Sequence, residues 1–140
     1  MKKTISVISL GCPRNLVDSE IMVSEFTKKG YMFQADAFNS NTVIVNTCAF
    51  VEDAKRESID TILEVMDAKK GGNIKKIIVA GCLSERYKDE LAGELKEVDE
   101  FRGVLSFKEP KNKILKLTPK YYTYIKVSEG CANRCTYCVI

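Results

Sequence analysis

Three cysteines follow short apolar segments at equivalent points along the chain. The tripeptides in which the segments end are Leu10-Gly11-Cys12, Asn46-Thr47-Cys48 and Ala80-Gly81-Cys82. Because parallel strands lie about 4.8 Å apart and end along one edge of a sheet, the three thiols would come together there. Three thiolates suit an iron-sulfur cluster with one open iron, whereas structural zinc takes four protein ligands. The alternative interpretation is that small, buried cysteines merely end three strands.

A second group, Cys131, Cys135 and Cys138, has the spacing C-x3-C-x2-C. A loop this compact can hold three corners of a cubane cluster. Zinc is again the alternative, but a zinc ribbon needs a second matching pair that this chain lacks. The chain has no histidine, which excludes mixed Cys/His zinc sites.

The elements that must position these cysteines alternate along the chain. Residues 4–10, 42–46 and 76–80 are rich in β-branched residues and predict central parallel strands. Helical spacing of apolar residues predicts helices over 16–26, 50–69 and 84–98, the last with Ser84 as N-cap. Edge strands are expected at 31–35 and 104–107. We therefore expect an α/β fold with an open, mostly parallel, flavodoxin-like sheet of order 2-1-3-4 and helices on both faces.

The domain boundary is expected after residue 107. Residues 108–120 predict a short lysine-rich linker helix bounded by prolines. Residues 121–127 predict one more strand, the first of a new domain over 121–140. We expect only the beginning of that domain to be present.

Composition excludes several classes of protein. The 140 residues are 45% hydrophobic and 29% charged, which is typical of a globular protein and argues against disorder. No apolar run approaches the roughly 18 residues of a membrane helix. The net charge of +3 gives no indication of nucleic-acid binding. We expect a cytoplasmic chain whose six cysteines are reduced or metal-bound rather than paired as disulfides.

With both cysteine groups in place, the whole chain resembles the beginning of a radical S-adenosylmethionine methylthiotransferase. Residues 9–20 (SLGCPRNLVDSE) and 124–131 (YIKVSEGC) resemble the RimO branch of that family, which modifies an aspartate of a small-subunit ribosomal protein. The branch that modifies tRNA adenosine usually has Gln-Met-Asn where this chain has Pro13-Arg14-Asn15, and it is the alternative assignment. A zinc-stabilised interaction domain is the alternative that is not an enzyme.

The resemblance implies two domains, each of which holds one cluster. Residues 1–107 would be the methylthiotransferase domain, and 121–140 the first strand and cluster loop of a truncated radical barrel. Cys131, Cys135 and Cys138 would hold the 4Fe-4S cluster that cleaves S-adenosylmethionine, and Cys12, Cys48 and Cys82 an auxiliary 4Fe-4S cluster.

Further expectations follow from the same resemblance. Tyr137 would pack near the adenine of the cofactor or against the barrel. The partners would be the ribosomal protein substrate and an electron donor, with no membrane and no nucleic acid bound by this part. No side chain is assigned a catalytic role, and the 140-residue chain alone is not expected to catalyse the reaction because most of the barrel is missing.

Overall fold

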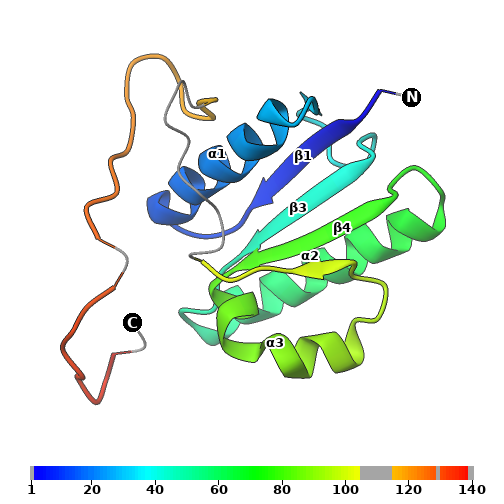
Figure 1. The fold of residues 1–140 in the computed structure, drawn as a ribbon. Helices are drawn as coiled ribbons and strands as arrows, with labels where there is room; N and C mark the ends of the chain where they lie inside the picture. The colour runs from blue at the N-terminus through cyan, green and yellow to red at the C-terminus, as the bar shows by residue number, and fades with distance from the viewer. Residues whose placement is uncertain (1, 105–114, 129, 139–140) are drawn as a thin grey trace.

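The computed structural model describes residues 2–104, 115–128 and 130–138. Strands and helices alternate within the first of these ranges (Figure 1). In chain order they are β1 (Thr4–Ser9), α1 (Pro13–Lys28), β2 (Met32–Phe33), β3 (Thr42–Thr47), α2 (Glu52–Lys70), β4 (Lys76–Gly81), α3 (Cys82–Glu94) and β5 (Glu100–Phe101).

The strands form one sheet of order β2-β1-β3-β4-β5, in which every neighbouring pair is parallel. The predicted α/β class, the parallel sheet and the order of its first four strands are thereby confirmed, and β5 extends the sheet by one strand. The order reverses between β1 and β3, the point at which open α/β sheets bind ligands at their carboxyl edge.

Helices cover both faces, as predicted, with α1 on one face and α2 and α3 on the other (Figure 1). Alternate residues of the central strands supply the two cores. Val43 and Val45 pack in the core under α2 and α3, whereas Ile44 packs with Met22 and Phe26 of α1. Every residue of β3 is buried, which explains why its sequence shows a continuous apolar run without alternation.

The start of α3 corrects the sequence prediction. The helix begins at Cys82, with Gly81 as N-cap at φ +93°, so Ser84 lies inside the helix and does not cap it. A Cβ at Gly81 would lie 2.4 Å from the Thr47 carbonyl oxygen. Glycine therefore lets the chain turn straight from β4 into the helix while packed against β3.

The last edge strand also differs from the prediction. It is β5, at Glu100–Phe101, and Arg102 after it donates its backbone N–H to the Val79 carbonyl at 2.8 Å. Val104 lies in a turn, where its N–H is held by the Glu85 carboxylate at 3.0 Å. Residues 105–107 of the predicted strand lie outside the described residues.

The predicted barrel strand at 121–127 is not found, because these residues have no regular secondary structure. A strand requires a hydrogen-bonded neighbour, and this segment instead lies against α1, where Lys126 pairs with Asp18. Of the predicted linker helix, 115–120 is not helical and 108–114 lies outside the described residues.

Candidate functional site

Cys12, Cys48 and Cys82 all lie at the carboxyl edge of the sheet, as predicted. We call them the sheet-edge cysteines. Cys48 directly follows β3 and Cys82 directly follows β4, and the residues before them, Thr47 and Gly81, are partners in the strand register. Cys12 follows β1 and is the N-cap of α1. Their ligation of a metal stays a prediction.

The loop that carries Cys12 packs directly against Cys48. Gly11 has φ +108°, and a Cβ on it would lie 3.0 Å from the Cys48 Cβ and 3.2 Å from the Cys48 Sγ. Any larger residue at position 11 would therefore press on the thiol. Glycine is required here both by its backbone conformation and by this close approach.

The electrostatic surroundings of the sheet-edge cysteines are mixed. Burial raises the pKa of the Cys82 thiol, and the nearby thiols of Cys48 and, more weakly, Cys12 also raise it. Arg14 and Arg86 act in the opposite direction and favour the thiolate. Because Cys12 caps α1 and Cys82 begins α3, two helix N-termini also favour negative charge at this edge.

A buried polar network lies beneath these cysteines. The side chain of Asn46, fully buried in β3, donates to the Asn15 carbonyl oxygen at 2.7 Å and to the Ser19 Oγ at 2.9 Å. Asn15 in turn donates its side-chain N–H to the Thr47 carbonyl at 3.1 Å, and Ser19 Oγ donates to Ser9 Oγ at 2.9 Å. The network joins the ends of β1 and β3 to the first turns of α1, the helix that Cys12 caps.

Ser58 of α2 holds Cys48 from the other face of the sheet. Its Oγ accepts a hydrogen bond from the Cys48 N–H at 3.1 Å and donates to the Cys48 carbonyl at 3.0 Å. Ser58 is fully buried. Sequence reasoning missed both this serine and the network around Asn46, although a polar residue closing an apolar strand was a visible signal for Asn46.

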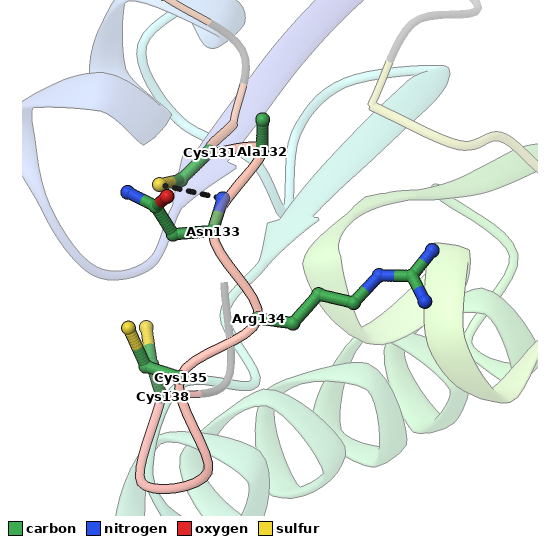
Figure 2. Close-up of a pocket in the computed structure, with 6 residues that line it drawn as sticks. All are labelled: Cys131, Ala132, Asn133, Arg134, Cys135 and Cys138. Atoms are coloured by element: carbon green, nitrogen blue, oxygen red, sulfur yellow. Dashed lines mark hydrogen bonds between the residues drawn. The ribbon is translucent and has the colours of Figure 1, made fainter.

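The second group, Cys131, Cys135 and Cys138, is exposed on the C-terminal segment, and we call its members the loop cysteines. Figure 2 shows the side chains of Cys135 and Cys138 pointing in the same direction, from a turn in which the Cys138 N–H donates to the Cys135 carbonyl at 3.1 Å. The Asn133 N–H donates to the Cys131 Sγ at 3.4 Å. The three cysteines line an open pocket of about 510 Å³ together with Ala132, Asn133 and Arg134.

Tyr137 lies in the turn between two of the loop cysteines and is 89% exposed. Its ring is free to meet a ligand, and its role in holding the cofactor stays a prediction.

The donor chemistry of both groups fits iron-sulfur clusters, since each offers three thiols. Within residues 2–104, 115–128 and 130–138, no three Cys, Asp or Glu side chains already stand at metal-binding distances. Cluster assembly would therefore draw the thiols inward from the positions seen here. The helices in the part of the chain that the structure describes include none long and apolar enough to cross a membrane.

Comparison with known proteins gives a family match. The sequence profile described as "Uncharacterized protein family UPF0004" matches residues 4–103. Three similar proteins carry the name "Ribosomal protein uS12 methylthiotransferase RimO". The protein from Bdellovibrio bacteriovorus is 44% identical over 165 residues (99% of this chain, 36% of the relative). The protein from Acetivibrio thermocellus is 43% identical over 172 residues (100% of this chain, 38% of the relative). The protein from Clostridioides difficile is 42% identical over 162 residues (97% of this chain, 36% of the relative).

The matches extend over both cysteine groups. The chain spans between 36% and 38% of the length of these three curated relatives. The similarity thus includes both the sheet and the C-terminal segment of this chain, and it covers little more than a third of each relative.

Proposed function

Because this chain belongs to the family UPF0004, we propose that it is the N-terminal part of a radical S-adenosylmethionine enzyme that methylthiolates the β-carbon of an aspartate in a small-subunit ribosomal protein. The printed names of its relatives support uS12 as that protein. The observation that carries the proposal is the placement of three cysteines at one sheet edge, in a chain that also has a C-x3-C-x2-C loop.

Two 4Fe-4S clusters and S-adenosylmethionine are the cofactors of the proposal. The sheet-edge cysteines would hold the auxiliary cluster and the loop cysteines the other, with Tyr137 beside the adenine. When bound, these groups supply reductive cleavage of the nucleotide and the sulfur that is transferred, with electrons from a separate donor.

The chain's own residues would position and shield these groups. Ser58 and the network around Asn46 hold the loops that present Cys12 and Cys48. Arg14 and Arg86 offset the negative charge that thiolate ligation brings to the edge. Cys48 and Cys82 are half-buried, so a group bound there would be partly withdrawn from water.

The proposed location is the cytoplasm, where the thiols stay reduced. The proposed partners are the ribosomal protein and the electron donor. Neither requires this part of the protein to bind nucleic acid.

Metal analysis tests the cofactor assignment. After anaerobic reconstitution, the 140-residue chain should contain about eight iron atoms and as many sulfides, as two 4Fe-4S clusters require. Cys12→Ser, Cys48→Ser and Cys82→Ser should each lower the iron to about half, and so should Cys135→Ser in the loop. Zinc without sulfide would contradict the proposal and favour a zinc-stabilised interaction domain.

The substrate is tested on the longer protein. Deleting its gene should remove the methylthio group from the ribosomal protein, measured by mass spectrometry, and leave tRNA nucleosides unchanged. Loss of a methylthio group from tRNA with the ribosomal protein unaltered would instead favour the tRNA adenosine branch.

A further inference from the structure

The C-terminal segment is attached to α1 by three contacts, which we call the α1 clasp. The Leu115 N–H donates to the Ser24 Oγ at 2.8 Å, and the Leu117 N–H donates to the Glu20 carboxylate at 2.8 Å. Further along, the Lys126 ammonium forms an ion pair with the Asp18 carboxylate. In Figure 1 the orange segment lies beyond α1, on the side of the sheet that this helix covers.

The α1 clasp is largely withdrawn from solvent. Glu20 and Ser24 are 6% and 2% exposed. The side chains of the Lys126–Asp18 pair are 17% and 11% exposed, whereas those of the Lys70–Asp67 pair on α2 are 61% and 78% exposed. Charges withdrawn from water are costly unless they are paired, so the buried pair favours one placement of the segment.

The contacts hold α1 from two sides. Glu20 and Ser24 are four residues apart and share a face of the helix. Asp18 precedes Glu20 by two positions, which places it roughly 160° around the helix axis. The segment therefore passes around α1 between Leu117 and Lys126, and it cannot shift along the helix without breaking both sets of contacts.

The ion pair also limits how far the loop cysteines can move. From Lys126 to Cys131 the chain reaches roughly 18 Å at full extension, whereas from Leu117 to Cys131 it reaches roughly 50 Å. At the other side of the contact, Asp18 lies about 9 Å along α1 from Cys12. With the ion pair formed, the free length of chain between α1 and the first loop cysteine is about a third of the length left when the segment is attached only at Leu117.

We propose that the Asp18–Lys126 ion pair is a positioning contact that sets the distance between the loop cysteines and the sheet-edge cysteines. This inference rests on the proposed function for the role of the two groups. Both residues act through the segment that carries the loop and touch no reacting atom.

Trypsin cleavage after Lys126 tests the contact on the 140-residue chain. In Asp18→Asn the ion pair between position 18 and Lys126 is lost, and cleavage there should become roughly 5- to 30-fold faster, because proteolysis follows the population of the open form. Asp67→Asn makes the same change in the exposed pair on α2 and should leave cleavage after Lys126 unchanged. An unchanged rate in Asp18→Asn overturns the proposal.

Magnetic coupling between the two reduced clusters tests the positioning role. Lys126→Met should weaken the coupling seen by electron paramagnetic resonance while the iron content stays full, and Lys126→Arg should retain it. Lys70→Met is the matched control on α2. Coupling equal to wild type in Lys126→Met overturns the positioning role. Failure of the wild type to take up iron would instead overturn the proposed function, and the cleavage rates would still decide whether the clasp exists.

Discussion

Crowding around the Cys48 thiol is a constraint set by a single residue, Gly11. Gly11 brings its backbone so close to Cys48 that an added methyl group would push the Cys48 side chain aside, and its positive φ is one that other residues adopt only under strain. The position of Cys12, the next residue, depends on this approach. The site therefore relies on a residue without a side chain as much as on its ligand candidates.

Gly11→Ala should separate crowding from backbone strain. We expect a loss of about 1–2 kcal/mol from the left-handed backbone, together with reduced iron uptake because the methyl group displaces Cys48. Gly30→Ala is the matched control, since Gly30 has φ +86° with nothing within 4 Å of a Cβ. It should lose similar stability in urea denaturation and keep its iron. Equal iron in the two variants would contradict the crowding argument.

Among the elements, α2 contributes to the site through a hydroxyl rather than a ligand. Ser58 satisfies both backbone groups of Cys48 where β3 has ended and no strand can do so. A helix on one face of the sheet thereby fixes a loop at its edge.

Ser58→Ala should cost about 1–3 kcal/mol, because it leaves the half-buried N–H and carbonyl of Cys48 without this partner. Thr61→Ala on the same helix is the control, since its hydroxyl bonds only to the Glu57 carbonyl at an exposed position. That change should stay within about 0.5 kcal/mol. Equal free energies of unfolding for the two variants would show that Ser58 does not hold the loop.

Asp99 connects α2 to the start of β4 and gives the fold a dependence on pH. Its carboxylate accepts hydrogen bonds from the Lys69 ammonium at 2.6 Å and the Ile77 N–H at 2.7 Å. Burial by itself raises the pKa of Asp99, but these bonds and the charges of Lys69 and Lys76 outweigh it, so the pKa is lowered overall. A lowered pKa means stability that is present above the unfolded value and lost as the pH falls through the folded one.

Asp99→Asn should therefore cost about 1 kcal/mol at pH 7, a modest amount because the side chain is 37% exposed and partly screened by solvent. The difference from wild type should shrink below about pH 4, as the native carboxyl becomes protonated. Urea denaturation at several pH values measures it. A difference that is constant down to pH 3 would contradict the assigned charge interaction.

Considered as a whole molecule, the protein keeps its two cysteine groups on separate parts of the chain. Both hydrophobic cores consist of residues from the sheet, its helices and the loops between them, and none comes from residues 115–128 or 130–138. The loop cysteines are exposed and reach the sheet through the α1 clasp. The described residues of the C-terminal segment therefore add nothing to the core of the sheet.

A chain ended at residue 120 should accordingly keep the sheet and lose one group. We expect the far-UV circular dichroism of an intact α/β fold and about four iron atoms after reconstitution, against about eight for the 140-residue chain. A shortened chain that folds but takes up no iron would show that the sheet-edge cysteines need the segment to assemble a cluster.

The central strands, their parallel arrangement and the edge at which three cysteines lie could all be predicted from the sequence. Strand formation depends on local runs of β-branched residues, and each cysteine follows its run directly, so position along the chain was sufficient. Where a local rule was ambiguous, the prediction was wrong: Ser84 looked like an N-cap, but Gly81 had already turned the chain into α3.

The surroundings of the cysteines could not be predicted, because they depend on contacts between distant parts of the chain. Residues 121–127 have strand-like composition, but strand formation needs a neighbour, and the segment lies against α1 instead. Asn46 meets Ser19 across 27 positions of sequence, and Lys126 meets Asp18 across 108. Such pairings follow from how the helices pack on the sheet, and no spacing along the chain encodes them, because polar side chains find partners by proximity in space.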